Sequence, residues 1–392
     1  MRLLKVLFLT SVDHPQIKYE AEYLGERFYI TYMVIPILSK KQLPYAFKCF
    51  FKSFPEICIP LLKLKAPPIP QSLLYVLELS IILCEGKLRS KKYDLIYAHW
   101  LYPAGFIGLI LSKIFNCKVV SAIWGYDIQV VHGVKGYGVK GLNRVIAKTV
   151  IEKSDLIIAN HKVHKILAQH LSSPIARDKI LYVPPAIPDV SVDAQDEFTI
   201  ELKEKLQFNI NKLREKNIVL YSSPLTPLYG IMEFLRAILI ISASVKDCIF
   251  IIVGDGELKD DVIKFVKKNE LGDKVFLVGK VSHESIKVLY KLSTLICDLA
   301  YPGTGTTALE ALCFGKPVIG IESPKTAITH GVDGFVIKKG DYKSLADYVI
   351  TILEDYKLRE TLSINARKTF EEKFIIQKRI NRLLKIFNNV IK

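Results

Sequence analysis

Short apolar runs alternate with helix-length segments along almost the whole chain, and this alternation limits the possible folds more than any other feature. The first six runs are VLFLT (6–10), YITYMVI (29–35), YDLIYAHW (93–100), KVVSAIWG (118–125), DLIIAN (155–160) and KILYVPP (179–185). The later runs are NIVLYSS (217–223), CIFIIVGDG (248–256), KVFLVGK (274–280), TLICDLA (294–300), PVIGIES (317–323) and GFVIKKG (334–340). Apolar runs of this length between helices are typical of parallel strands covered on both faces. The sequence therefore predicts an α/β fold with doubly wound sheets.

The stretch YVPPAIPDV separates the alternation into two halves. Its residues Pro184, Pro185 and Pro188 cannot continue regular structure. A chain of 392 residues also exceeds what one hydrophobic core usually serves. We therefore predict two domains with a boundary at residues 187 and 188, each binding ligands at the carboxyl ends of its strands.

Composition and cysteine usage restrict the class of protein. Half of the residues are apolar and 24% are charged, which is typical of a folded chain. The seven cysteines are widely spaced and form no CxxC pair, which favours buried thiols over disulfides or a metal site. No apolar stretch is long enough to span a bilayer, and the start MRLLKVLFLTS fits a first strand better than a signal peptide. We expect a cytoplasmic protein.

The positive charge is concentrated in the first half. Residues 1–190 carry 25 Lys and Arg against 13 Asp and Glu, a balance of +12, out of a net charge of +16 for the chain. Within this half, residues 40–65 hold six lysines and one acid, interleaved with phenylalanines. Aromatic rings between lysines suit a helix lying on an anionic membrane surface. The alternatives are a core-facing helix with a solvated lysine face and, with the least support, a nucleic-acid surface.

The stretch YPGTGTTALEALCFGKPVIG (301–320) indicates a site for an anion. Its small residues Gly303 to Thr307 precede a helix, and glycine allows a ligand close approach to backbone N–H groups at the helix start. Glu310 follows one turn later and can accept hydrogen bonds from hydroxyl groups. Diphosphate on the loop and ribose on the carboxylate would suit a sugar nucleotide. The alternative is an ordinary helix capped by Thr304 or Thr306.

The second half resembles a known enzyme family. IIVGDGELKDD, KVFLVGKVSHESIKVLYKL, GTGTTALEALCFGKPVIG and HGVDGFVIKKGD occur in the order found in GT-B glycosyltransferases of family 4. The segment DLIYAHWLYPAGFIGLILSKIFNCKVVSAIWGYD is similar to the acceptor domain of that family. The resemblance implies two Rossmann-like domains facing a cleft, an acceptor-binding one at 1–187 and a nucleotide-sugar-binding one at 188–375. It also implies that the last helix, within residues 376–392, crosses back to the first domain.

The resemblance further implies a function and a set of ligand-binding residues. The expected activity is hexosyl transfer from a nucleotide-sugar to a hydroxyl of a lipid-linked or glycan acceptor, with retention and without a metal ion. Glu310 matches the ribose ligand of the family. The other expected donor-binding residues are Gly303, Thr304, Gly305, Thr306 and Thr307 on the diphosphate loop and Gly279, Lys280 and Val281 beside the base.

Three departures from the family pattern leave other functions open. Pro224 and Tyr229 stand where the family has the Arg and Lys of its diphosphate clamp, and Pro302 replaces a second acid. Trp124 replaces the histidine of the family's His-Gly pair. Other lysines, with Lys280 and Lys325 as candidates, could substitute for the clamp. Otherwise the donor differs, the chain is a non-catalytic scaffold, or it performs another GT-B reaction such as sugar-nucleotide epimerisation.

In the first domain, two polar residues follow strand-like runs and are candidates for catalysis. His99 has an imidazole suited to polarising a hydroxyl, and Asp127 follows the WGY turn. The alternatives are a buried structural histidine and a turn-forming or capping aspartate. Asp13 and His14 occupy the first strand–helix loop, without the glycines that a phosphate site there would need. We expect no nucleic-acid partner and a peripheral position on the inner face of the membrane.

Overall fold

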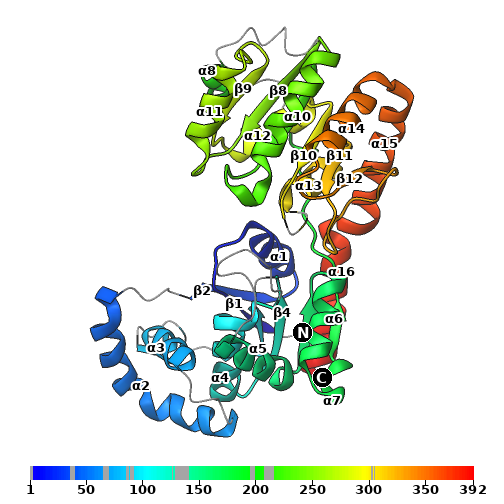
Figure 1. The fold of residues 1–392 in the computed structure, drawn as a ribbon. Helices are drawn as coiled ribbons and strands as arrows, with labels where there is room; N and C mark the ends of the chain where they lie inside the picture. Colours follow the sequence, from blue (N-terminus) through cyan, green and yellow to red (C-terminus); the bar gives the residue numbers. More distant parts are fainter. Residues whose placement is uncertain are drawn as a thin grey trace. The chain divides into compact units, whose positions relative to one another are not determined.

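The computed structural model describes residues 3–35, 40–64, 70–84, 88, 92–125, 127–128, 141–194, 199–206, 216–301, 303 and 305–392. The chain divides into two compact units (Figure 1). The first unit comprises Met1–Pro185 together with Ile376–Lys392, and the second comprises Ala186–Ile375. The division therefore lies within the proline-rich stretch, and the end of the chain belongs to the first unit.

The first unit is built on a parallel sheet of six strands. Their order across the sheet is β2-β1-β3-β4-β5-β6. The strands are β1 Lys5–Thr10, β2 Tyr29–Val34, β3 Leu95–His99, β4 Lys118–Ile123, β5 Leu156–Ala159 and β6 Ile180–Tyr182. From β1 the chain adds β2 on one side and then β3 and the later strands on the other side. The place where this order reverses, between β1 and β3, is the switch point at which doubly wound sheets bind ligands.

Helices surround this sheet. They are α1 Pro15–Gly25, α2 Leu43–Leu64, α3 Pro70–Cys84, α4 Phe106–Phe115, α5 Gly141–Lys153, α6 Lys162–Leu171, α7 Pro174–Arg177 and α16 Ile376–Ile391. A 3-10 turn, η1 Lys40–Gln42, precedes α2, and a wider turn, η2 Leu101–Gly105, precedes α4. Figure 1 shows α16 within the first unit, where it packs with α1. The expected return of the last helix to this unit is therefore present.

The second unit has a parallel sheet of the same size. Its strand order is β12-β11-β10-β7-β8-β9. The strands are β7 Asn217–Ser222, β8 Cys248–Val253, β9 Val275–Gly279, β10 Leu295–Asp298, β11 Val318–Ile321 and β12 Gly334–Ile337. The helices are α8 Ile200–Leu206, α10 Ile231–Ser244, α11 Lys259–Lys268, α12 His283–Leu292, α13 Thr306–Cys313, α14 Tyr342–Glu354 and α15 Tyr356–Thr369, with the short turns η3 Pro227–Tyr229 and η4 Phe370–Phe374.

Each apolar run of the sequence forms a strand, and apart from β1 the strands are shorter than the runs. The residues of β8 are all buried, which is why an uninterrupted apolar run is needed there. The runs lose residues at their carboxyl ends, where the chain leaves the sheet. In YDLIYAHW, for example, the strand ends at His99 and a turn begins at Trp100. The predicted α/β architecture with two doubly wound sheets is confirmed.

A buried ion pair attaches α16 to the first unit. Arg379 Nε lies 2.8 Å from Glu20 Oε1, and both side chains are 1% exposed. The same guanidinium donates to the backbone oxygens of Val183 and Pro184 at 2.8 and 2.6 Å and to Asn160 Oδ1 at 2.9 Å. The charge of Glu20 is thus compensated inside the unit by a residue from the last helix.

Candidate functional site

The loop between β10 and α13 in the second unit is organised by a buried acid. Asp298 ends β10, and its carboxylate accepts hydrogen bonds from the N–H groups of Ala300 at 3.4 Å and Gly305 at 3.3 Å. Burial raises the pKa of Asp298 to about 6, and the bonds from the backbone oppose the shift. Asp298 was not among the residues expected from the sequence. It fixes the loop that leads into α13.

The residues expected to bind diphosphate lie along this loop. Gly303 has φ of 102°, and a Cβ there would lie 2.6 Å from Ser323 Oγ, so both its conformation and its packing require glycine. Gly305 is exposed and has open space around it. Thr306 begins α13, and Thr307 Oγ1 donates to the carbonyl oxygen of Ser222 at 2.8 Å. Thr304 and Pro302 lie outside the described residues.

Glu310 lies one turn into α13, beside an imidazole. Its side chain is 13% exposed, and its Oε1 lies 3.2 Å from Nε2 of His283, the first residue of α12. The hydrogen bond that His283 donates to Glu310 raises the pKa of His283. Tyr290 is buried nearby; burial, followed by the charge of Glu310, raises its pKa. The Glu310 carboxylate is therefore largely enclosed, with His283 as a hydrogen-bond partner and the buried Tyr290 close to it.

The residues expected beside the base lie at the end of β9. Gly279 has φ of 72°, and its carbonyl oxygen accepts from the Gly254 N–H at 3.0 Å. The carbonyl oxygen of Lys280 accepts from Lys205 Nζ, and Val281 packs partly buried against the core. At Gly254 a Cβ would lie 2.1 Å from the carbonyl oxygen of Ser223. Gly254 is therefore required by the packing of this turn.

The turn after β7 carries no cation, and lysines from two other loops approach the same region. Tyr229 packs partly buried against the core, and its carbonyl oxygen accepts from Tyr221 Oη at 2.9 Å. Lys325 follows β11 and packs beside Gly303, since a Cβ on that glycine would lie 2.9 Å from Lys325 Cβ. Lys339 follows β12, and its Nζ lies 4.5 Å from the centre of the Tyr301 ring.

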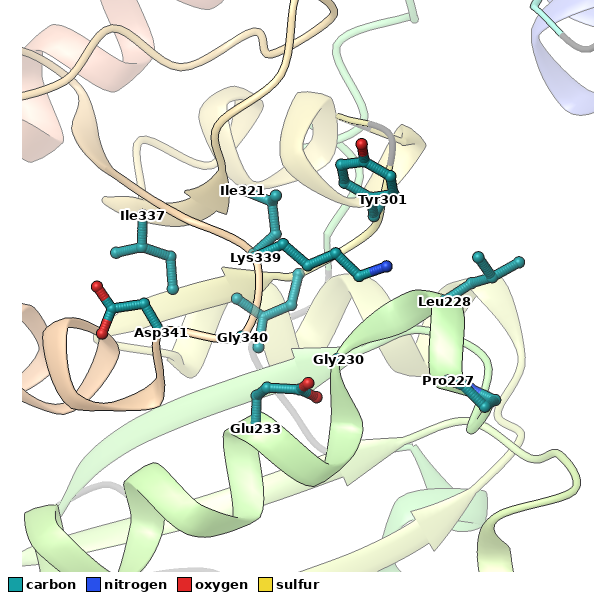
Figure 2. A pocket seen from close by; sticks show the side chains of 11 residues that line it. Pro227, Leu228, Gly230, Glu233, Tyr301, Ile321, Ile337, Lys339, Gly340 and Asp341 are labelled. Atoms are coloured by element: carbon teal, nitrogen blue, oxygen red, sulfur yellow. The ribbon is translucent and has the colours of Figure 1, made fainter. Parts of the chain in front are cut away.

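The pocket in Figure 2 shows how Lys339 lies. Its side chain extends from the end of β12 toward Tyr301, and Glu233 of α10 and the η3 turn line the same pocket. The sequence indicated Lys325 as a substitute for the diphosphate clamp but did not indicate Lys339, because only the folded sheet brings the loop after β12 to Tyr301.

In the first unit, the candidate residue His99 is fully enclosed. Its side chain is fully buried at the end of β3, and its Nδ1 accepts from Trp124 Nε1 at 3.1 Å. Burial holds the pKa of His99 well below its usual range. Its Nε2 has no hydrogen-bond partner among the residues that the structure describes. The neutral His99 therefore holds the Trp124 ring in place by accepting this hydrogen bond.

Asp127 joins two backbone turns. Its buried carboxylate accepts from the N–H groups of Leu101 at 3.0 Å, Trp124 at 3.3 Å and Gly125 at 2.8 Å. Burial raises the pKa of Asp127 to about 6, and these N–H groups oppose the shift. The contacts are those of the turn-forming alternative, so Asp127 positions the chain after β3 and after β4.

Two faces of α2 differ sharply. Ala46, Cys49 and Ser53 are buried and face the unit. On the other face Phe47 is 44% exposed and Phe51 is 74% exposed. Tyr45 and the lysines Lys41, Lys48 and Lys52 are exposed with them. The side chains of Lys40, Phe54 and Lys63, and the whole of Lys65, lie outside the described residues.

The described part of the chain lacks two kinds of feature, a metal-binding cluster and a helix that could cross a membrane. No three His, Cys, Asp or Glu side chains lie together there as a metal ion would require. Among the described helices, none is both long and apolar enough to cross a membrane.

Comparisons with known proteins place both units. A family model described as glycosyl transferases group 1 matches residues 203–369, and one described as glycosyl transferase 4-like matches residues 67–161. The chain is 24% identical to N-acetyl-alpha-D-glucosaminyl L-malate synthase of Bacillus anthracis, over 78% of this chain and 77% of that relative. It is 25% identical to the UDP-Gal:alpha-D-GlcNAc-diphosphoundecaprenol alpha-1,3-galactosyltransferase of Escherichia coli, over 80% of this chain and 79% of that relative.

The fold has counterparts among solved structures. HepE of Anabaena, solved in complex with UDP-glucose, superposes with a TM-score of 0.67 at 18% identity and covers 98% of this chain and 100% of its own. The glycosyl transferase 4-like model matches part of the first unit, and the group 1 model matches most of the second unit. The chain belongs to the group 1 glycosyltransferases and has the GT-B fold.

Proposed function

We propose that this glycosyltransferase moves a hexosyl group from a nucleotide-sugar to a hydroxyl of a lipid-linked or glycan acceptor, with retention and without a metal ion. The observation that carries the proposal is the position of Glu310, one turn into α13 and beside the open backbone of Gly305. A carboxylate at this place can accept two ribose hydroxyls while the helix start faces the diphosphate. The solved neighbour binds UDP-glucose, and the E. coli relative is named for a diphosphoundecaprenol acceptor.

A panel of nucleotide-sugars tests this proposal. Purified protein is heated with UDP-, GDP- and ADP-sugars, and the ligand that raises the melting temperature is then assayed for transfer with and without a chelator. We expect one nucleotide to stabilise the second unit by mass action and to support transfer in the chelator. Transfer that stops with chelator and returns with Mg²⁺ or Mn²⁺ would contradict the metal-independent part.

A non-catalytic scaffold is the second candidate. The observation that favours it is the turn after β7, where Pro224 and Tyr229 bring no positive charge to the leaving diphosphate. Electrostatic stabilisation of developing charge is often the largest contribution to catalysis. No stabilisation by any nucleotide-sugar in the panel would support the scaffold over the enzyme.

Lys325 and Lys339 are our candidates for the charge that this turn lacks. Replacing both by glutamine is expected to weaken donor binding about tenfold, which is about 1.4 kcal/mol. The effect is modest because Lys339 is exposed and its charge is screened by solvent. Isothermal titration with the stabilising nucleotide measures it. The matched control is Lys264→Gln on the exposed face of α11. Equal affinities of the double variant and the control would show that neither lysine binds the donor.

We also propose that α2 docks the first unit on an anionic membrane surface, where a lipid-linked acceptor is found. Phe47 and Phe51 are exposed next to Lys48 and Lys52, so rings and charges share one face. Each lysine near an anionic surface contributes about 1 kcal/mol. Replacing these four residues by serine is expected to abolish co-sedimentation with anionic liposomes at low salt, and the wild-type protein should bind less as salt rises.

The control for docking changes a comparable set on other helices of the same unit. It replaces two exposed apolar residues and two cations by serine: Ile166, Ile175, Lys162 and Arg177. Phe50 is left unchanged because it packs partly buried against the core. Equal binding of the α2 variant and the wild type would contradict docking, and the acceptor would then be sought among soluble glycans.

A further inference from the structure

Both tryptophans of the chain lie in one aromatic cluster at the carboxyl ends of β1, β3 and β4. The cluster consists of His14, His99, Trp100 and Trp124. The Trp100 and Trp124 ring centres are 5.8 Å apart, and His14 lies 5.4 Å from Trp124 and 6.4 Å from Trp100. Trp100 is 4% exposed, whereas His14 and Trp124 are half-buried. The chain thus presents one indole and one imidazole to the surface at the sheet's switch point.

The cluster is held rigidly from below. Trp100 has φ of 73°, a strained conformation for a residue other than glycine that persists only where the surroundings impose it. Asp127 supplies that constraint, because its carboxylate binds the N–H groups of Leu101 and Trp124 together. His99 fixes the Trp124 ring by accepting its Nε1–H. His99 and Asp127 are therefore positioning residues of the aromatic cluster.

His14 offers a hydrogen-bond donor at the edge of this cluster. It caps α1, and its Nδ1 accepts from the Gln16 N–H at 3.3 Å. The ring proton of the neutral imidazole is therefore on Nε2, which has no partner among the described residues. Burial lowers the pKa of His14, so this neutral form prevails near pH 7.

We propose that Trp124 and His14 bind a sugar ring of the acceptor, with the apolar C–H face of the ring on the indole and an acceptor hydroxyl oxygen accepting from His14 Nε2–H. This inference rests on the proposed function and names its acceptor as a carbohydrate. A pyranose offers an apolar face and hydroxyls together, which matches a half-buried aromatic ring with a donor at its edge. A polyprenyl chain alone would leave the donor of His14 buried without a partner.

The proposal also accounts for the departure at Trp124. The resembling family has a histidine at this position, and here the position supplies the aromatic surface. His14, on the neighbouring loop, supplies the imidazole in its place. The ring centres of His14 and Trp124 are 5.4 Å apart, close enough for both side chains to contact one sugar ring.

Tryptophan fluorescence tests the site without any donor. Trp100→Phe leaves Trp124 as the single tryptophan, and the protein is titrated with methyl glycosides of hexoses and of N-acetylhexosamines, with glycerol as the control. We expect a saturable change in emission with at least one glycoside and none with glycerol. The absence of a change with every glycoside would overturn the proposal. A change without nucleotide binding or transfer would support this site while the proposed function failed.

A capping-preserving variant tests His14. In His14→Asn the amide oxygen can still cap α1, so the melting temperature should not change, whereas His14→Ala loses the cap and should have a lower melting temperature. Both variants lack the Nε2 donor, so glycoside affinity should fall in both. With the nucleotide-sugar found by the panel as donor and the glycoside found by the titration as acceptor, kcat/KM is expected to fall about 10²-fold, as when a single positioned hydrogen-bond donor is lost.

Restoring a histidine is the final check. Trp124→His in the His14→Asn background should not recover the lost kcat/KM, because it returns an imidazole but removes the indole on which the sugar ring lies. Wild-type glycoside affinity and kinetics in His14→Asn would overturn the role of His14.

Discussion

Arg379→Met is expected to destabilise the first unit by roughly 3–5 kcal/mol, because it leaves a buried carboxylate without its partner. Glu20 is 1% exposed, and Arg379 together with Tyr97 provides its hydrogen bonds. The substitution also removes the donors to the Val183 and Pro184 oxygens. The charge, the hydrogen bonds and the attachment of α16 are lost together.

Thermal unfolding followed by circular dichroism measures this effect, and two variants make it specific. Arg382→Met, on the exposed face of α16, should unfold like the wild type. Glu20→Leu combined with Arg379→Met should recover much of the stability, since it removes both charges at once. Because the chain has two units, the melting curve is analysed as two transitions. An unchanged first-unit transition in Arg379→Met would contradict the role of the pair.

Glu310→Gln is expected to weaken nucleotide-sugar binding about 10- to 150-fold without changing the fold. A carboxylate accepts hydrogen bonds from ribose hydroxyls, and bonds to charged groups contribute about 1.5–3 kcal/mol each. The fold should be unaffected because the glutamine side chain has the shape of the glutamate side chain and its amide oxygen can still accept the hydrogen bond from His283. Titration of the variant with the stabilising nucleotide measures the loss of affinity.

Glu284→Gln is the control for this experiment, since that acid is exposed on α12 and pairs with Lys287. Unchanged affinity in Glu310→Gln would favour the alternative, an ordinary capped helix in which Glu310 binds no ligand. A His283→Gln variant distinguishes the contribution of His283 from that of Glu310. The glutamine amide keeps a hydrogen-bond donor near Glu310, so nucleotide affinity should fall less than in Glu310→Gln.

Local patterns in the sequence were sufficient to predict the sheets. A parallel strand with helices on both faces must be apolar at nearly every position, as in CIFIIV of β8, and such runs are visible without any structure. Strand ends were predicted less well. The run around His99 continued through Trp100, where the chain turns away with positive φ. The local sequence HWLYP does not indicate that turn, because the turn is held by Asp127, which lies in the loop after β4.

The candidate site divides in the same way. Gly303, Gly305 and Glu310 stand close together in the sequence, so the approach of backbone and acid to one ligand could be predicted there. Asp298 and His283 were missed as partners because their roles depend on contacts between different elements. Lys339 and His14 reach their neighbours only through the order of strands in the sheet. The ligand-binding roles of all these residues stay predictions until the variants are measured.

The place of α16 affects the order in which the protein can mature. Residues 376–391 complete the first unit, yet the ribosome makes them after the whole of Ala186–Ile375. Domains commonly fold as they emerge, the N-terminal one first. Here the first unit must wait, with Glu20 uncompensated, while the second unit is synthesised and can fold. A nascent chain stalled before Arg379 should therefore carry a folded second unit and an unfinished first one, and this is the stage at which a chaperone would be needed.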